Sequence, residues 1–412
     1  MHMLRLSLLA LQTSALGVHA TTHAPVVSKG VVVDDNDLNQ QISDLAHQAL
    51  EQAKQSIGGP ESAVSTRSTS CNLKTLRVRR EWGALSKCER TDYIKAVKCL
   101  QSRPANTPSS VAPGAKTRFD DFVATHINQT LAIHYTGNFL VWHRYFTWLY
   151  EEALREECGY LGTQPYWDWA KTAATGMHAS PIFDGSDTSM SGDGEPIANQ
   201  SKVVLTGINL PPLYLDPGTG GGCVVSGPFK DLVVNLGPAA LAVPGGSQQA
   251  NPNGPLAYNP RCLKRSLTDT INKEFANATA VLSLLVGTDN VYDFEMQMQG
   301  IPEDASIGVH GGGHYALGGD PGRDVFVSPG DPAFYLHHGM IDRTWWIWQN
   351  LKPSERFSGP KALIGTNTFL NNPPSANTTY DDFVQYGFAA GPPRQIKELM
   401  STVAGPFCYV YE

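Results

Sequence analysis

Histidines that could bind a metal are concentrated in two parts of the sequence. One part is the stretch 119–146, and the other comprises HGGGH at 310–314 and DPAFYLHHGMIDRTWW at 331–346. Imidazole nitrogens suit zinc, copper, iron or nickel, whereas Mg²⁺ and Ca²⁺ prefer carboxylate ligands. A single histidine is most often a core or surface residue, but this clustering predicts two metal sites of three imidazoles each. Seven histidines are candidates for these six ligand positions, namely His126, His134, His143, His310, His314, His337 and His338.

The spacing of these histidines fits helices that bring them together. His310 and His314 are four residues apart, so a helix places both imidazoles on one side. Three glycines inside that helix cost about 3 kcal/mol relative to alanine. Binding of one metal by both imidazoles would offset this cost, and glycines would leave open space beside the metal for a substrate. His143 shares a helix face with Phe139 and Phe146, which predicts that it points inward.

The identity of the metal follows from the neighbouring residues. A zinc peptidase would carry HExxH with a glutamate base, but glycines stand between His310 and His314, which argues against a zinc hydrolase. Neither histidine region has cysteine or methionine at the spacing of a blue-copper site. Two three-imidazole sites suit a coupled copper pair, because neutral nitrogens stabilise Cu(I) and still accept Cu(II). Iron remains an alternative on chemistry alone.

A mainly helical domain with a large irregular component is expected to position these residues. Apolar residues recur at helical spacing in seven stretches, at 37–57, 87–100, 118–127, 138–157, 267–286, 307–317 and 332–350. A long connection rich in glycine and proline, 185–261, contains GTGGG at 218–222. These glycines lack the strand and helix of a dinucleotide-binding turn, so no nicotinamide or flavin is expected.

The N-terminal residues are typical of an exported protein. Residues 1–20 combine one arginine, an apolar stretch and small residues suited to cleavage, which predicts a signal peptide and secretion. Residues 21–70 are expected to be a pro-segment or an N-terminal helix with a linker, and 71–412 the catalytic domain. Four glycosylation sequons, at Asn128, Asn199, Asn277 and Asn377, agree with export.

Cysteine usage and charge narrow the possibilities further. Seven cysteines in a secreted chain predict up to three disulfides and one free thiol, with Cys223–Cys262 as one expected pair. The net charge is −7, and no basic stripe with interleaved aromatic residues is present, so nucleic acid is not an expected partner. The apolar stretch of the leader is too short to span a membrane, and no other stretch reaches 18 uncharged apolar residues.

The combined motifs resemble the type-3 copper proteins, which are tyrosinases, catechol oxidases and haemocyanins. The resemblance rests on the histidine spacings, on DPxFxxHHxxxDRxW, on PYWDWA at 165–170 and on the Tyr-x-Tyr at 409–411. It covers about 71–412 and is strongest for short, secreted fungal members. It implies a four-helix-bundle core that holds two copper ions, with long irregular loops and few short strands. Small phenols and O₂ are the implied partners.

The resemblance also assigns roles to individual residues. It implies that one copper is bound by the three histidines of 119–146 and the other by His310, His314 and His338, with His337 as a neighbour. Asp342, one helical turn after His338, is expected to accept the other N–H of that imidazole. Gly311 and Val325 are the expected substrate-pocket residues.

Departures from the family pattern favour catechol oxidation. Ala132 stands where many relatives carry a cysteine cross-linked to the second ligand, so that thioether cannot form. Gly311 stands where efficient monophenol hydroxylases often have asparagine, which predicts weak hydroxylation. Val325, where some plant relatives have phenylalanine, would admit small phenols. The expected activity is therefore oxidation of o-diphenols to o-quinones with reduction of O₂ to water.

Three alternatives stay open from the sequence. A full tyrosinase and an o-aminophenol oxidase would use the same metal centre. A haemocyanin-like oxygen carrier would also use it, but carriers shield the site with a lid. No C-terminal lid domain is expected here, because the sequence stops directly after the Tyr-x-Tyr.

Overall fold

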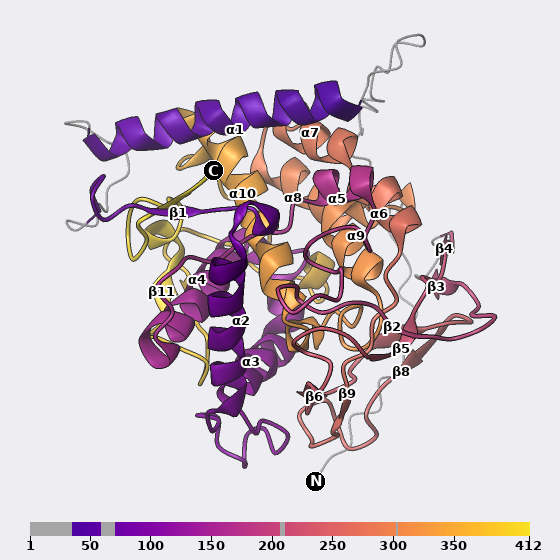
Figure 1. The fold of residues 1–412 in the computed structure, drawn as a ribbon. Helices are drawn as coiled ribbons and strands as arrows, with labels where there is room; N and C mark the ends of the chain where they lie inside the picture. The colour runs from indigo at the N-terminus through magenta and orange to yellow at the C-terminus, as the bar shows by residue number, and fades with distance from the viewer. Residues whose placement is uncertain (1–34, 59–70, 207–210, 302–303) are drawn as a thin grey trace. The chain divides into compact units, whose positions relative to one another are not determined.

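The computed structural model of the protein describes residues 35–58, 71–206, 211–301 and 304–412. The predicted leader, 1–20, lies outside these residues. Helices dominate the described chain (Figure 1), and none of them is both long and apolar enough to cross a membrane. The helices are α1 Asp35–Gly58, α2 Lys87–Ser102, α3 Arg118–Ile133, α4 Phe139–Cys158, α5 Trp169–Thr175, α6 Asp269–Phe275, α7 Ala278–Gly287, α8 Val291–Gln299, α9 Gly308–Leu317, α10 Ala333–Leu351 and α11 Pro353–Arg356.

Four helices form the bundle at the centre of the fold, which confirms the predicted fold class. They are α3, α4, α9 and α10, and α10 packs against both α4 and α9. Every residue of α10 from Ala333 to Asn350 is buried, so this helix is covered on all sides and forms the middle of the core. Capping boxes fix the starts of α2 and α3, where Ser86 and Thr117 pair with the third residue of each helix.

The strands are short and pair only two at a time within the described residues. They are β1 Arg77–Arg79, β2 Gly194–Pro196, β3 Val203–Leu205, β4 Leu213–Leu215, β5 Gly221–Val224, β6 Val233–Val234, β7 Leu241–Val243, β8 Ser247–Gln249, β9 Arg261–Cys262, β10 Phe383–Val384, β11 Arg394–Gln395 and β12 Tyr409–Tyr411. β1 and β12 form a parallel pair, and the other five pairs are antiparallel. The 185–261 connection is thus organised by short, two-stranded antiparallel pairs.

The protein contains three disulfides, as predicted. Cys223 bonds to Cys262, and the other pairs are Cys71–Cys408 and Cys99–Cys158. Cys88 is the free, exposed cysteine. The bond between Cys71 and Cys408 joins residues 337 positions apart, beside the β1–β12 pair. It therefore fixes the chain near residue 71 to the C-terminal strand.

The helix predicted over 267–286 is wrong as a single element. It is broken into α6 and α7 at Ala276 and Asn277. The Asn277 side chain accepts a hydrogen bond from the Ala280 amide, so it caps a new helix in place of continuing the old one. This role also occupies the side chain of one predicted glycosylation sequon, whereas Asn128, Asn199 and Asn377 are exposed.

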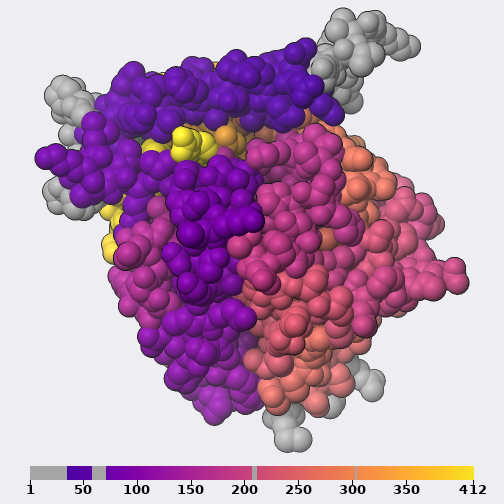
Figure 2. Space-filling model, in the orientation of Figure 1, coloured from indigo at the N-terminus to yellow at the C-terminus, as the bar shows by residue number. Residues whose placement is uncertain are grey.

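Within the described residues, helix α1 packs against the core and is not a separate appendage. Ile42, Ala46, Ala49 and Ala53 are buried, and the helix contacts α10, α7 and β12. Figure 2 shows α1, in indigo, lying over C-terminal residues drawn in yellow and orange. Small alanine side chains let α1 approach closely, so this helix covers the outer side of α10.

A charge placed in this contact should destabilise the whole domain. Ala49 is 0% exposed, so Ala49→Glu would bury an unpaired carboxylate. We expect the free energy of unfolding to fall by at least about 2 kcal/mol, measured by thermal or urea unfolding. Gln48→Glu adds the same charge on the exposed face and should change it by less than about 0.5 kcal/mol. Equal effects of the two substitutions would show that α1 does not pack against α10 and α7.

Candidate dinuclear metal centre

The first histidine group lies between α3 and α4. His126 is on α3, His134 follows the last residue of that helix, and His143 is on α4. One nitrogen of each ring lies within 4.8 Å of the others, and all three rings are buried. Each Nδ1 lies 2.8–3.0 Å from a backbone carbonyl oxygen, and these carbonyls belong to Phe326, Thr130 and Phe139. A carbonyl only accepts, so each Nδ1 carries the proton and each Nε2 lone pair is left for another partner.

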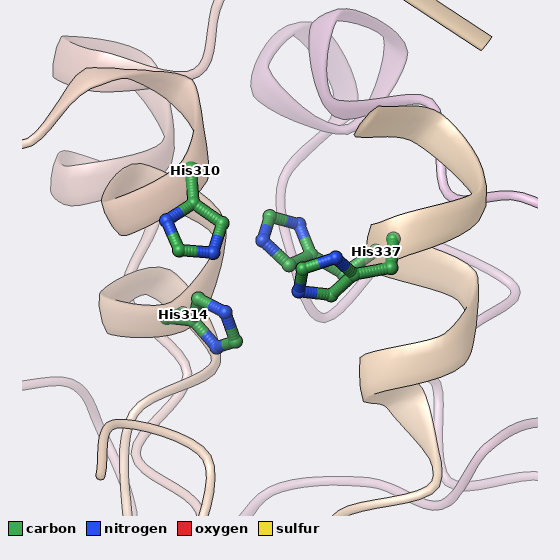
Figure 3. Close-up of side chains that lie close together, drawn as sticks. His310, His314 and His337 are labelled. Atoms are coloured by element: carbon green, nitrogen blue, oxygen red, sulfur yellow. The ribbon is translucent and has the colours of Figure 1, made fainter. Parts of the chain in front are cut away.

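The second group lies between α9 and α10. It contains His310 and His314 on α9 and His337 and His338 on α10, again with nitrogens within 4.8 Å of one another. Figure 3 shows His310 and His314 one above the other on their helix, facing His337 across the gap between the two helices. The Nδ1 of His314 donates to the Gly322 carbonyl at 3.0 Å, so its Nε2 is also left free.

The two groups adjoin each other and fit a pair of cations. The His143 ring stacks on the His338 ring at a centroid distance of 4.6 Å, which joins one group to the other. The Nε2 atoms of His126 and His143 are only 3.5 Å apart, although neither carries a proton when both Nδ1 atoms donate. Both nitrogens of His338 and the Nε2 of His310 are buried without a hydrogen-bond partner. Buried lone pairs that converge in this way are satisfied by a bound metal.

His337 differs from the other members of its group. Its Nδ1 accepts a hydrogen bond from the Trp169 indole N–H at 3.0 Å. The proton of its neutral ring must therefore be on Nε2, which leaves no lone pair for a metal. That His337 is a neighbour and His338 a ligand stays a prediction, because the Nε2 of His337 is also buried without a hydrogen-bond partner. Trp169 belongs to α5, which the sequence pattern did not predict.

Gly312 and Gly313 of HGGGH serve close packing, which corrects the prediction that these two leave open space. A Cβ on Gly313 would lie 2.2 Å from the His337 ring, and one on Gly312 would lie 2.8 Å from Phe275. Side chains there would push α9 away from α10 and α6. The cost of glycine in this helix is thus offset by the approach of the two histidine-bearing helices.

Asp342 does not bind His338, contrary to the predicted hydrogen bond. Its carboxylate instead accepts from Arg144, Arg79, Tyr409 and Tyr411, at 2.6, 3.3, 2.6 and 2.6 Å. Burial alone would raise the pKa of Asp342, but the two guanidinium charges and two hydroxyls hold this pKa below its usual value. The aspartate therefore joins α10 to α4, β1 and β12, and it positions the helix and not the imidazole.

A second buried ion pair fixes the start of α10. The guanidinium of Arg265 binds both oxygens of Asp331 at 2.7 and 2.8 Å, and both side chains are fully buried. One of these oxygens also accepts from the Ala333 amide at 2.9 Å. The aspartate of the DPxF motif, which precedes the N-cap Pro332, therefore satisfies the first amide of the helix that carries His337 and His338.

The two predicted pocket residues lie beside the histidine groups. Gly311 directly follows His310 on α9 and is half-buried. Val325 is 37% exposed and precedes Phe326, whose carbonyl binds the Nδ1 of His126. Val325 is therefore adjacent in sequence to the residue whose carbonyl accepts from His126, and that it contacts a substrate stays a prediction.

Burial keeps these imidazoles neutral and predicts a pH-dependent stability. It lowers the pKa of His134 and His314 to about 4, and it lowers the pKa of the other five well below the usual histidine value. The unfolded chain has a histidine pKa of about 6.5, so between pH 6.5 and 4 it binds more protons than the folded chain. Stability that is present above pH 6.5 is therefore lost as the pH falls.

Urea unfolding of the metal-free protein at pH 7, 5.5 and 4.5 measures this effect. We expect the free energy of unfolding to fall as the pH is lowered through this window, because the unfolded chain takes up protons that the buried imidazoles do not. A free energy of unfolding that stays constant from pH 7 to pH 5 would contradict neutral, buried imidazoles.

Several residues that hold the site were not predicted from the sequence. Arg79, Arg144 and Arg265 carry buried charges, and Glu295 on α8 is also buried. Charged residues inside apolar helical stretches are the signal that could have identified Arg144. For Arg79 and Arg265, the partner is too distant along the chain for any local pattern.

Comparisons with known proteins identify the family. Residues 116–351 match the family model described as the common central domain of tyrosinase. Tyrosinase P of Aspergillus terreus is 45% identical over 336 residues, covering 81% of this chain and 91% of that protein. N-acetyl-6-hydroxytryptophan oxidase of Emericella nidulans is 41% identical over 357 residues, covering 83% and 94%.

A solved structure agrees with the whole described fold. A mutant polyphenol oxidase from Thermothelomyces thermophila is 43% identical, with a TM-score of 0.82, and the match covers 92% of this chain and 100% of that one. Members of this family bind two copper ions, and the two adjoining histidine groups suit such a dinuclear centre. The chain therefore belongs to the tyrosinase family of type-3 copper proteins and is a copper oxidoreductase of the tyrosinase and polyphenol oxidase kind.

Proposed function

We propose that this protein oxidises o-diphenols to o-quinones with dioxygen. Two o-diphenols each lose two electrons and two protons, and one O₂ takes up the four electrons and four protons to give two waters. The observation that carries the proposal is the pair of adjoining histidine groups, whose free Nε2 atoms converge from α3, α4, α9 and α10. Copper, when bound there, supplies the redox chemistry.

Six of the seven histidines are proposed as ligands. His126, His134 and His143 would hold one copper, with their rings fixed by the carbonyl bonds at Nδ1. The other copper would be held by His310, His314 and His338. The bond from Trp169 to His337 supports leaving His337 out of this set.

Gly311 and Val325 are proposed to contact the phenol. Val325 is small and partly exposed beside the carbonyl that orients His126, so it leaves room for a ring to approach. Gly311 offers no side chain to hold a proton-accepting water, which favours diphenols over monophenols. The protein thus orients the diphenol and excludes water. The neutral imidazoles leave their Nε2 atoms unprotonated and available to bind copper.

A hydroxylated indole is a second candidate substrate. The relative from Emericella nidulans is named for oxidation of N-acetyl-6-hydroxytryptophan, and it is similar to this chain along 83% of its length. Both substrate classes are aromatic rings with a hydroxyl group, and the same centre could oxidise either.

Oxygen uptake by the copper-loaded protein tests the proposed activity. We expect prompt uptake with 4-methylcatechol and at least about tenfold slower uptake with 4-methylphenol, measured with an oxygen electrode. Prompt uptake with both compounds, without a lag, would make the protein a full tyrosinase. An absence of uptake with either compound, despite two bound coppers, would contradict an oxidase and favour an oxygen carrier.

Secretion and the retention of α1 complete the proposal. The predicted signal peptide and the three disulfides are typical of an exported protein. The match to the fungal polyphenol oxidase covers 92% of this chain, whereas residues 71–412 make up only about 83% of it. That match extends into the residues before 71, which supports α1 as a lasting part of the catalytic domain and not a discarded pro-segment.

A further inference from the structure

The segment between α9 and α10, residues 318–332, supplies backbone carbonyls to both histidine groups. The Phe326 carbonyl accepts from the Nδ1 of His126 at 2.9 Å, and the Gly322 carbonyl accepts from the Nδ1 of His314 at 3.0 Å. His126 belongs to the first group and His314 to the second. Side chains that fix the backbone of this segment therefore also fix the orientation of one proposed ligand on each side of the centre.

Asp324 lies in this segment and holds its backbone with a buried carboxylate. One carboxylate oxygen accepts from the Phe326 amide at 3.0 Å. The other oxygen accepts from the Ala239 and Ala240 amides at 2.7 and 3.1 Å. The Asp324 side chain thus joins the residue whose carbonyl orients the first group to the long connection rich in glycine and proline.

The surroundings of Asp324 differ from those of the other aspartates in the segment. Those two are paired with arginines, Asp320 with Arg261 and Asp331 with Arg265. Asp324 is 0% exposed and has no such ion pair within the described part of the chain. A buried charge is costly unless hydrogen bonds satisfy it, and here three backbone amides do so. The cost of this carboxylate is therefore offset through the backbone that it holds.

The ion pair of Asp320 holds a different part of the same segment. The Arg261 guanidinium binds both Asp320 oxygens at 2.6 and 2.8 Å. Asp320 is two residues before Gly322, whose carbonyl accepts from His314. This pair therefore holds the part of the segment that orients the second group, and Asp324 holds the part that orients the first.

Close packing places the long connection directly against this turn. Gly237 has a φ of 79°, and a Cβ there would lie 2.7 Å from the fully buried Val327 side chain. This position favours glycine both for its conformation and for its space. The approach brings the Ala239 and Ala240 amides within reach of the Asp324 carboxylate.

We propose that Asp324 is a positioning residue, whose carboxylate fixes the Phe326 carbonyl against the 239–240 backbone and so orients the His126 imidazole for metal binding. The inference rests on the proposed copper-binding role of the first histidine group. Val325 stands between Asp324 and Phe326, so the same hydrogen bonds fix the backbone of a residue that is proposed to contact the phenol.

Two substitutions of Asp324 test this role. Asp324→Ala removes all three hydrogen bonds. Asp324→Asn keeps the shape and one acceptor oxygen, but its NH₂ group cannot accept from an amide, so the bridge is broken on one side. We expect Asp324→Ala to lower the affinity of one copper site by about 10-fold or more, and Asp324→Asn to lower it by at least about threefold. Copper affinity is measured by competition with a chelator.

The metal-free protein gives a second measurement, which a general loss of stability would not change. Nitrogen NMR of the imidazole rings shows which ring nitrogen carries the proton. In the wild type we expect the proton on Nδ1 in both His126 and His314. In both Asp324 variants, His126 should become a mixture of two tautomers. His314 should keep its proton on Nδ1, because the Arg261–Asp320 pair is intact.

Asp193 provides a matched control in the same long connection. Its carboxylate also accepts from backbone amides, those of Gly194 and Leu267 at 2.8 and 3.0 Å, but it lies outside the segment 318–332. Asp193→Ala should leave copper affinity and the His126 tautomer unchanged. A loss of copper affinity in Asp193→Ala as large as in Asp324→Ala would overturn the proposal, because any carboxylate that fixes a loop would then have the same effect.

The outcomes also distinguish this proposal from the proposed function. A wild-type copper affinity with a single His126 tautomer in Asp324→Ala would overturn the positioning role. Failure of the wild-type chain to bind two coppers would overturn the proposed function, whereas the His126 tautomer in the metal-free protein would still test Asp324. If Asp324→Ala does not fold, Asp324→Asn decides by the same two measurements, and wild-type values in both would overturn the proposal.

Discussion

Replacing His338 with alanine is expected to leave one copper ion in place of two and to remove oxidase activity. Both ring nitrogens of His338 are buried without a partner, so the structure gives this side chain no role other than packing and metal binding. Its ring stacks on His143 at 4.6 Å, at the junction of the two groups. Loss of a residue that only orients a metal ligand costs 10–100-fold, so loss of a ligand should lower activity by more than about 100-fold. Copper content by mass spectrometry and oxygen uptake with a catechol measure both effects.

The adjacent histidine provides the control for this prediction. His337→Gln keeps a side chain that can accept the Trp169 N–H, and we expect the variant to retain two copper ions. Loss of copper from His337→Gln, together with retention by His338→Ala, would reverse the assignment of the ligand in the second group.

Replacing Asp342 with alanine should cause the largest loss of stability. Arg79, Arg144 and Asp342 are all buried, so the substitution leaves two guanidinium groups without their shared carboxylate. Removing one partner of a buried ion pair costs about 3–5 kcal/mol. Arg79 retains Glu151 as a partner at 2.5 Å, whereas Arg144 keeps only carbonyl and amide oxygens. We therefore expect a loss of about 3–5 kcal/mol in the free energy of unfolding, measured in urea.

Tyr409→Phe is the matched substitution in the same network. It removes one hydrogen bond to the Asp342 carboxylate and leaves all charges paired. Its expected cost is about 1.5–3 kcal/mol, the value for a hydrogen bond to a charged group. A loss for Asp342→Ala no larger than that for Tyr409→Phe would contradict a role in balancing the buried arginines.

The helices of the metal centre could be predicted because their signals are local. The four-residue spacing of His310 and His314 indicates a helix. Helix α10 is a long, largely apolar stretch that contains two histidines. The split of 267–286 into α6 and α7 was missed, because Asn277 within an apolar run resembles a tolerated polar residue until its side chain is seen to cap. Helix α8 was missed because its nine residues are short for a periodic signal.

The contacts that position the metal centre could not be predicted, because they join distant residues. Asp342 lies one turn after His338, and this spacing predicts a hydrogen bond between the His338 imidazole and the Asp342 carboxylate. Its partner Arg79 is 263 positions away, and the arginine charges attract the carboxylate more strongly than a neutral imidazole does. The HGGGH pattern likewise predicts glycines that leave space for a substrate, whereas Phe275 and His337 occupy the space beside Gly312 and Gly313. Patterns in the sequence indicate which residues could bind metal, but only the packed structure shows what orients them.

The most direct test of the dinuclear copper centre is anomalous diffraction at the copper edge from crystals of the copper-loaded chain. We predict two copper peaks, one among His126, His134 and His143 and the other among His310, His314 and His338, with the His337 ring bonded to Trp169. A single peak, or a peak bound by His337 in place of His338, would contradict this account.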